Sequence, residues 1–191
     1  MRLFVALEIS SAVRASLAAL MKELRALERP SSAKRMRWVR PENLHVTLKF
    51  IGEAAPEKLE AIRAGLSAVH SAQPVELRFR GLGFFPNEKR PGVFWAGIEA
   101  SPNVAALAAD VDLHLEKAEF PRESRPFTPH LTLARFEPSG IAPELRAALR
   151  ESAARDFGLL RTAEFHLIES KLKPSGAEYT TLQSFPFAAE D

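Results

Sequence analysis

The sequence predicts an α+β fold built from two similar halves, and three observations support this prediction. Segments with the period of strands and segments with helical spacing follow one another in the same order twice. The pattern His-x-Thr-Leu occurs at 45–48 and again at 130–133. Short loops containing Pro and Gly join the segments, without a low-complexity linker. We therefore expect a single domain over residues 1–191, with pseudo-repeats of roughly 1–92 and 93–191.

The first half of the chain predicts strand, helix, strand, helix, strand. Ser10 and Ser11 suit the N-cap of the first helix, whose Ala/Leu-rich run reaches about Leu27. The expected strands are 2–9, the basic piece 34–39, the motif segment 41–50 and 75–85, and the second expected helix is 56–69.

The second half predicts the same order. A helix begins at Ser101-Pro102 and runs over 103–118, and a loop at 119–129 leads into the second motif. The expected strands are 93–99, the motif segment 130–136, 162–172 and 179–187, with a further helix over 143–154.

Composition limits the possible functions. The 191 residues are 46% hydrophobic and 26% charged, which is ordinary for a globular protein with one sizeable core. Lys and Arg outnumber Asp and Glu by only 26 to 24, so any anion must be bound locally rather than through bulk charge. The absence of cysteine excludes disulfides, thiolate nucleophiles and Cys metal sites.

Localisation is expected to be cytoplasmic. The first twenty residues lack the basic-then-apolar order of a signal peptide, and no apolar run approaches the length of a membrane span. The lack of cysteine fits a reducing compartment.

The segment PENLHVTLKF at 41–50 alternates between an apolar and a polar face, as a half-buried strand does. Strict alternation gives an apolar face of Leu44, Val46, Leu48 and Phe50, and a polar face of His45, Thr47 and Lys49. The segment PFTPHLTLARF at 126–136 repeats the pattern with His130 and Thr132. A shuffled chain of this composition would contain His-x-Thr-Leu about 0.02 times, so two copies are not accidental.

Two His-x-Thr faces can perform acid and base catalysis. Residues two apart on a strand project to the same side, roughly 6 to 7 Å apart, so each histidine has a threonine as its neighbour. An imidazole with a pKa of about 6.5 can accept or donate a proton near neutrality, and the threonine hydroxyl can hold an anionic oxygen. If both faces surround one phosphate, they predict metal-free cleavage of a phosphodiester with a bell-shaped pH profile.

Other uses of the histidines are less consistent with the sequence. Neither motif has the spacing of a zinc site, and zinc would need a third ligand from elsewhere. A structural histidine is the alternative for each motif, but the duplication argues against it. For His70, His114 and His166, which lack a threonine two residues on, we favour structural roles.

Arg135 lies five residues after His130, and strict alternation places it on the opposite face of the strand. A β-bulge or a turn at the end of the strand would redirect it toward a phosphate or a base.

A basic cluster precedes the first motif and consists of Lys34, Arg35, Arg37 and Arg40. It either follows an RNA backbone or forms the solvated edge of a sheet, and we favour the edge. Trp38 and Trp95 either stack on a base or pack in the core, and we favour the core for both.

The two motifs, together with GLGFFPNEKRPGVFWAGI, RPFTPHLTLAR and the ending ESKLKPSGAEYTTLQSF, resemble the two-histidine (2H) phosphoesterases. The resemblance covers nearly the whole chain and is strongest to the RNA 2′,3′-cyclic phosphodiesterase branch, also called LigT- or ThpR-like. It implies a bilobal α+β fold: two lobes related by a pseudo-twofold axis, antiparallel sheets lining a central cleft, helices outside, and pseudo-repeats interleaved in space.

The resemblance also implies an activity and residue roles. The reaction is hydrolysis of RNA 2′,3′-cyclic phosphate ends to a 2′-phosphate, without metal or cofactor and with reverse 2′-5′ ligation as a side activity. His45 is implied as the proton donor to O3′, His130 as the base that activates water, and Thr47, Thr132 and Arg135 as substrate ligands. The expected partners are RNA ends, tRNA fragments among them, with no membrane and a monomeric protein.

Two alternatives stay open at this point. One keeps the site and changes the substrate to a small cyclic nucleotide or to ADP-ribose cyclic phosphate. The other is a non-catalytic module that binds RNA ends, which predicts binding without turnover.

Overall fold

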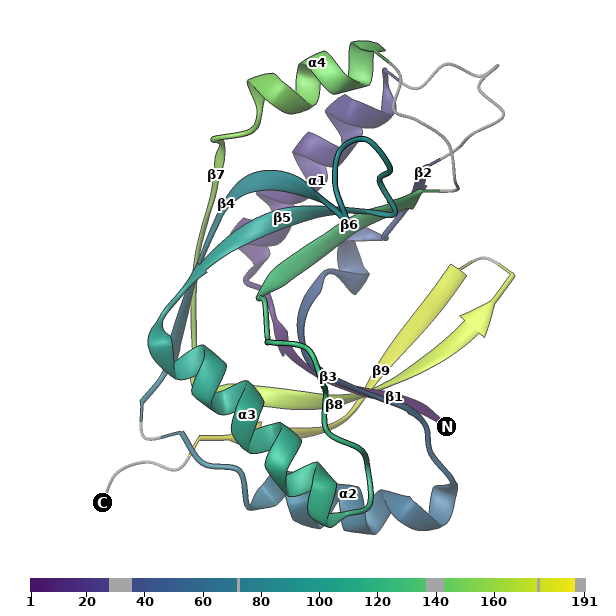
Figure 1. Ribbon diagram of the computed structural model, residues 1–191, viewed down its shortest axis with the longest axis vertical. Helices are drawn as coiled ribbons and strands as arrows, with labels where there is room; N and C mark the ends of the chain where they lie inside the picture. Colours follow the sequence, from purple (N-terminus) through teal and green to yellow (C-terminus); the bar gives the residue numbers. More distant parts are fainter. Residues whose placement is uncertain (28–35, 72, 137–142, 175, 188–191) are drawn as a thin grey trace.

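The structure is a computed structural model, and it describes residues 1–27, 36–71, 73–136, 143–174 and 176–187 (Figure 1). The first half contains β1 (Arg2–Glu8), α1 (Ser11–Arg25), β2 (Met36–Trp38), β3 (His45–Glu53), α2 (Leu59–Ser67) and β4 (Val75–Phe85). Single 3₁₀ turns at Pro41–Asn43 and Pro56–Lys58 precede β3 and α2. The second half contains β5 (Val93–Ala100), α3 (Pro102–Lys117), β6 (His130–Phe136), α4 (Pro143–Glu151), β7 (Asp156–Thr162), β8 (Glu164–Lys173) and β9 (Gly176–Pro186).

The strands form two antiparallel sheets. Sheet A has the order β3-β1-β8-β9, and sheet B has the order β2-β6-β5-β4-β7. Each sheet contains strands from both halves of the chain, so the halves are interleaved in space. The α+β class with antiparallel sheets is confirmed, whereas an origin by duplication stays a prediction.

Helices cover the outer faces of the two sheets. In Figure 1, α2 and α3 lie together beside sheet A, while α1 and α4 lie beside sheet B. The contacts agree, because α3 packs on β3 and on α2, and α1 packs on β7. The α1 helix begins as expected, with the Ser10 hydroxyl accepting a hydrogen bond of 3.3 Å from the Val13 N–H. None of the helices in the described part of the chain is long and apolar enough to cross a membrane.

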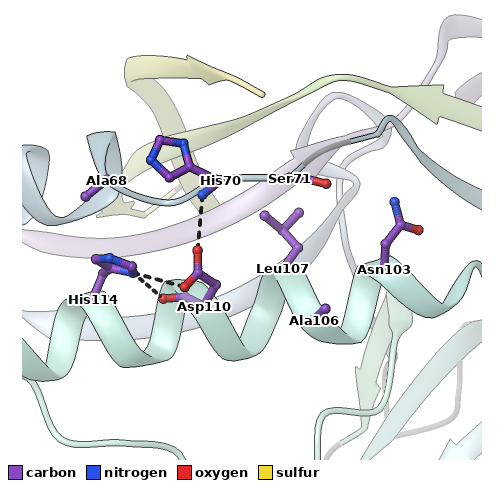
Figure 2. Close-up of a pocket in the computed structure, with 8 residues that line it drawn as sticks. All are labelled: Ala68, His70, Ser71, Asn103, Ala106, Leu107, Asp110 and His114. Carbon is purple, nitrogen blue, oxygen red and sulfur yellow. Dashed lines mark hydrogen bonds and ion pairs between the residues drawn. The ribbon is translucent and has the colours of Figure 1, made fainter. Parts of the chain in front are cut away.

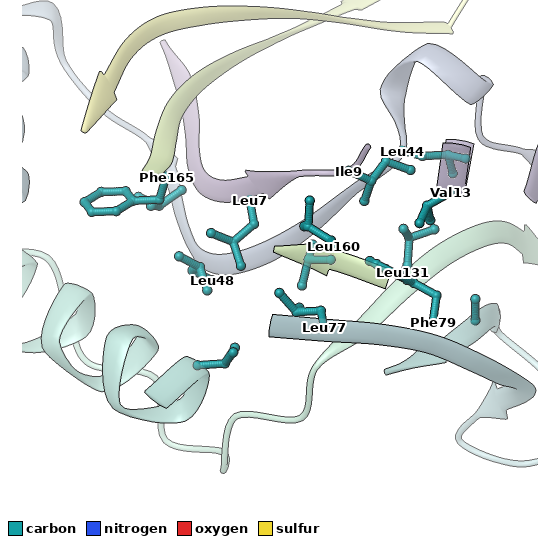
Figure 3. Packing of buried hydrophobic residues seen from close by; sticks show 14 of the residues in the cluster. Leu7, Ile9, Val13, Leu44, Leu48, Leu77, Phe79, Leu131, Leu160 and Phe165 are labelled. Carbon is teal, nitrogen blue, oxygen red and sulfur yellow. The ribbon is translucent and has the colours of Figure 1, made fainter. Parts of the chain in front are cut away.

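The core contains apolar side chains of both motif strands. Leu7 and Leu48 from sheet A, and Leu77 and Leu131 from sheet B, belong to one buried cluster (Figure 3). Because side chains alternate along a strand, burying Leu131 turns its neighbours His130 and Thr132 to the other face. Burial of the apolar positions thus fixes the direction of the polar ones.

Strand β7 was not expected from the sequence. Its pairing with β4 skips Phe157 next to Gly158, which has φ +112°, so a β-bulge interrupts the strand. Phe157 and Leu160 are therefore both buried although they are three residues apart, and Leu159 is exposed. This spacing hides the period of two on which strand prediction depends.

Candidate active site

The first motif strand contains a β-bulge directly after Thr47. The pairing of β3 with β1 skips Leu48, and the alternation of side chains changes phase beyond that point. Lys49 is therefore only 6% exposed, while Phe50 is 63% exposed. The prediction that Lys49 shares a face with His45 and Thr47 is wrong, and so is the placement of Phe50 on the buried face.

Lys49 instead connects β3 to the second half of the chain. Its ammonium group forms a buried ion pair with Asp112 of α3 and donates a hydrogen bond of 2.8 Å to the Pro121 carbonyl. The Asp112 carboxylate also accepts a hydrogen bond from the Glu123 N–H at 3.2 Å. One ion pair thus ties the first motif strand to the loop that leads into the second.

The second motif strand has a bulge at the equivalent place. The pairing of β6 with β5 skips Leu133, directly after Thr132. His130, Thr132 and Arg135 pair with three alternate residues of β5, and directly paired residues share a face of the sheet. The bulge that would redirect Arg135 is therefore present, and all three side chains project from the same side.

Both motif histidines are anchored in the same way. The Nδ1 atom of His45 lies 2.7 Å from the Asn43 carbonyl oxygen, and Nδ1 of His130 lies 2.9 Å from that of Thr128. A carbonyl oxygen only accepts, so Nδ1 carries the hydrogen in each ring. In the neutral rings Nε2 is the basic atom, and it is the atom that can exchange a proton with a substrate. Asn43 is itself held by a hydrogen bond of 2.7 Å to the Ala177 carbonyl.

Aromatic rings surround His45. The Phe4 ring lies 4.7 Å from the imidazole, and the Tyr179 ring meets it edge-on at 5.3 Å. Burial lowers the pKa of His45 below its ordinary value of 6.5, and the hydrogen bond to the Asn43 carbonyl opposes the shift. The Phe4 ring also lies 6.0 Å from Phe50, so Phe4 contacts both the histidine and that exposed ring.

His130 has a different set of neighbours. The Phe85 ring meets it edge-on at 5.0 Å, and Trp95 lies 5.2 Å from Phe85. Trp95 pairs directly with Thr132, so it lies on the site face rather than in the core as expected. Its indole covers Gly83, where a Cβ atom would come within 2.2 Å of the ring. Trp38 packs against the core, as expected.

The two motif strands approach each other although they belong to different sheets. The Cα atoms of β3 and β6 come within 8 Å. Burial raises the pKa of the Tyr179 phenol on sheet A, while the positive charges of Arg135 on sheet B and Arg2 on sheet A lower it. Arg135 thus acts across the gap between the sheets.

The other histidines have structural partners. A groove of about 540 Å³ between α3 and the segment that follows α2 is lined in part by His70, His114 and Asp110 (Figure 2). His114 Nδ1 lies 3.2 Å from the Asp110 carboxylate, which also accepts the His70 backbone N–H at 3.1 Å. His166 is buried, and its Nδ1 contacts the Ser184 hydroxyl at 2.9 Å. These contacts agree with structural roles for His114 and His166, whereas the His70 contact involves the backbone N–H, so a structural role for its imidazole stays a prediction.

Two further sequence predictions concern metal and the basic cluster. Among the described residues, no group of three or more His, Cys, Asp or Glu is arranged to hold a metal ion.

The described part of the basic cluster lies at the edge of a sheet. Arg37 and Arg40 are exposed on β2 and just after it, and β2 is an edge strand of sheet B, which is the placement that the sequence favoured. Lys34 and Arg35 lie outside the described residues.

The fold and the site together define a class of protein: an interleaved α+β molecule in which each sheet contributes one bulged His-x-Thr strand. Comparison with known families gives the more specific assignment. Residues 13–173 match the model of the 2′-5′ RNA ligase superfamily, and the chain belongs to this family.

Individual relatives agree with the assignment. A protein of Archaeoglobus fulgidus named RNA 2′,3′-cyclic phosphodiesterase is 36% identical over 185 residues, which cover 97% of this chain and 99% of the relative. One with the same name from Thermus thermophilus is 35% identical over 197 aligned positions, with 100% and 92% covered.

Solved structures have the same fold. The crystal structure of TT0787 of Thermus thermophilus has a TM-score of 0.76 and 34% identity, with 100% of each chain covered. Escherichia coli LigT complexed with 3′-AMP has a TM-score of 0.73 and 25% identity, with 97% of each chain covered.

Proposed function

We propose that this protein hydrolyses RNA 2′,3′-cyclic phosphate ends to 2′-phosphates, with His45 and His130 as general acid and base and without a metal. The relatives named RNA 2′,3′-cyclic phosphodiesterase support the substrate class. The main support for the mechanism is the pair of equivalent His-x-Thr strands, whose histidines are both anchored through Nδ1 and whose strands approach within 8 Å.

The proposed reaction is a single displacement at phosphorus. Nε2 of neutral His130 takes a proton from water as the water oxygen attacks phosphorus. The bond from phosphorus to O3′ breaks, and protonated His45 gives its Nε2 proton to O3′. The product keeps the phosphate on O2′ and has a free 3′-hydroxyl. Because the two rings start in opposite protonation states, activity falls on both sides of an optimum pH.

Hydroxyl and guanidinium groups hold the phosphate in this proposal. Thr47 and Thr132 project beside the two histidines, where their hydroxyls can donate to the non-bridging oxygens. Arg135 adds a positive charge on the His130 side. The anionic phosphate also favours protonation of His45, which offsets the lowering of its pKa by burial in the free protein.

Phe50 is proposed as a platform for the terminal base. It follows the bulge of β3 as Arg135 follows the bulge of β6, and it is 63% exposed beside the rings around His45. An exposed phenyl ring at a nucleotide site gains free energy by stacking on a base, whatever the base. We assign Phe50 to base binding and Arg135 to phosphate or base binding.

The remaining features of the proposal follow from the resemblance and, for the cytoplasmic location, from the N-terminal sequence and the absence of cysteine. The physiological substrates include tRNA fragments with cyclic ends, the protein acts as a cytoplasmic monomer, and the reverse reaction joins RNA ends through a 2′-5′ linkage.

The decisive experiment uses a short RNA with a 2′,3′-cyclic phosphate end, incubated with the protein in excess chelator. We expect complete conversion to an end that bears a 2′-phosphate and a free 3′-hydroxyl. Periodate treatment before and after phosphatase treatment shows whether one of the two terminal hydroxyls carries a phosphate. Comparison with synthetic 2′- and 3′-phosphate standards identifies the hydroxyl that keeps the phosphate. The His130→Ala protein is the matched control for contaminating nucleases.

Three results would contradict the proposal. Activity that disappears in chelator and returns with a divalent metal would exclude a metal-free site. A 3′-phosphate product would mean that O2′, rather than O3′, is the leaving group. Tight binding of the cyclic end without turnover would favour the binding module.

A further inference from the structure

Arg2 and Arg135 stand out among the arginines. Most guanidinium groups in the described ranges bind a carboxylate, a carbonyl oxygen or an aromatic ring, as Arg78, Arg146 and Arg155 do. Within those same ranges, the guanidinium groups of Arg2, Arg90 and Arg135 form neither a hydrogen bond nor an ion pair, and of these three Arg2 and Arg135 act on Tyr179 beside His45. The proposed reaction uses Arg135 but gives no role to Arg2.

The strand register places Arg2 on the site face of sheet A. β1 pairs with β8 so that Leu3 faces Glu169, and one further step in this antiparallel register brings Arg2 opposite Ser170. Ser170 pairs in turn with Tyr179 of β9. Arg2, Ser170 and Tyr179 therefore form a row across three strands, with their side chains on one face. Arg2 shares this face with Phe4, because residues two apart project to the same side.

Tyr179 connects this row to the catalytic histidine. Its ring contacts Phe4 at 5.1 Å and His45 at 5.3 Å, both edge-on. Burial raises the pKa of the phenol, so it stays neutral and can donate a hydrogen bond at any working pH. Arg2 and Arg135 both oppose that shift, which means that both positive charges act at the phenol oxygen.

The carboxylates nearest this row already have partners. Glu53 pairs with Arg2 along the backbone ladder, but its side chain lies 3.7 Å from the N-terminal ammonium group. Glu8 accepts a hydrogen bond of 3.3 Å from the Thr181 hydroxyl. The exposed Arg2 guanidinium is therefore available to an anion from solution.

We propose that Arg2 and Tyr179 form a second phosphate subsite beside His45, which takes the phosphate on the 5′ side of the terminal nucleoside. A guanidinium group and a neutral phenol together supply the charge and the donors that a phosphate oxygen prefers. The inference rests on the proposed function, because it takes His45 to mark the reactive phosphate. It makes the protein selective for an end that carries a further phosphate.

Such a phosphate can come from two sources. In an RNA chain it is the diester that joins the last two nucleotides, and in a free nucleotide it is a 5′-monoester. Three substrates separate these sources: adenosine 2′,3′-cyclic phosphate, the same molecule with a 5′-phosphate, and the dinucleotide ApA with a 2′,3′-cyclic end. They present the same reacting bond and differ only on the 5′ side.

We expect kcat/KM for the dinucleotide to exceed that for the plain nucleoside by on the order of tenfold to a hundredfold, mainly through KM. An equal gain with the 5′-phosphorylated nucleotide would mean that the subsite reads a phosphate in either form. A gain with the dinucleotide alone would assign the subsite to RNA. Both results support the subsite, whereas equal kcat/KM for all three substrates would overturn it.

Variants test which residues carry the preference. In Arg2→Gln the ratio of kcat/KM for the dinucleotide over the nucleoside should fall close to one, and in Tyr179→Phe it should fall part of the way. The salt dependence should also weaken, because a lost phosphate contact lowers the slope of log kcat/KM against log salt by about 0.7. Arg161→Gln is the matched control, since this 67% exposed arginine lies on the far edge strand β7. Equal losses on both substrates in Arg2→Gln would contradict the assignment.

A binding measurement keeps this test separate from turnover. Calorimetry compares adenosine 2′-phosphate with ApA ending in a 2′-phosphate, in the wild-type protein and in Arg2→Gln. Preference for the dinucleotide that depends on Arg2, without hydrolysis of any cyclic substrate, would refute the proposed function and retain the subsite. Hydrolysis of all cyclic substrates without such a preference would do the reverse.

Discussion

Strands β3 and β6 share the pattern His-x-Thr-Leu, a β-bulge after the threonine and an Nδ1 anchor to the carbonyl two residues before the histidine. Their surroundings differ. His45 is packed between the rings of Phe4 and Tyr179, whereas His130 has an edge-on contact with Phe85. The same local geometry therefore presents two imidazoles in different environments. Neighbours from other strands, rather than the motif, distinguish the two histidines.

The residues beyond the two bulges differ more. The buried position is Lys49 in β3 and Ala134 in β6, and the site-facing position is Phe50 in β3 and Arg135 in β6. One motif strand thus brings an aromatic ring to the site and the other brings a positive charge. A nucleotide has a base and a phosphate, so this asymmetry suits a substrate with two chemically different parts.

Removal of either imidazole should have the largest effect. We expect His45→Ala and His130→Ala each to lower kcat by about 10² to 10⁴-fold while the protein stays folded. A cyclic end with sulfur in place of O3′ sharpens the comparison, because a thiolate leaves without a proton. His45→Ala should recover much of its activity on this substrate, and His130→Ala should not. Recovery in His130→Ala alone would mean that His130 is the general acid and His45 the general base.

The ion pair between Lys49 and Asp112 at the β3 bulge should contribute to the stability of the fold. Asp112→Ala leaves the Lys49 ammonium group buried, with one carbonyl partner, and we expect a loss of about 3 kcal/mol in the free energy of unfolding. Lys49→Met in the Asp112→Ala background should restore part of that loss, because the unpaired charge is gone. Urea denaturation measures both. A loss below about 0.5 kcal/mol in Asp112→Ala would show that the pair contributes little.

The smallest expected effect concerns the pH dependence of stability. Burial lowers the pKa of folded His45, while in the unfolded chain this group titrates near 6.5. Between the two pKa values the unfolded chain binds more protons, so the free energy of unfolding falls as the pH drops below 6.5 and is insensitive to this group above it. Urea midpoints across this range should vary less in His45→Gln than in the wild type. An NMR titration in which His45 keeps a pKa of 6.5 or more would contradict the prediction.

Much of the architecture can be predicted from the spacing of apolar residues and from the residues that begin and end helices and strands. Helix-start signals predict the helices that begin at Ser11 and Pro102, and alternation predicts the long strand at 75–85. Both kinds of signal are local in the sequence. β7 was missed, and Lys49 and Phe50 were assigned to the wrong faces, for a single reason. A β-bulge shifts the phase of alternation by one residue, and the sequence carries no mark of where it falls.

The sequence by itself determined the two His-x-Thr faces, since the chemistry of imidazole and hydroxyl and the period of a strand are local properties. The tertiary structure decided which further side chains join them. Register with neighbouring strands turned Arg135 to the same face as His130 and Lys49 into the interior, while sheet order brought Tyr179 to His45 and placed Arg2 in the same row as Tyr179. These placements depend on pairings between residues far apart in the sequence, which no local pattern encodes.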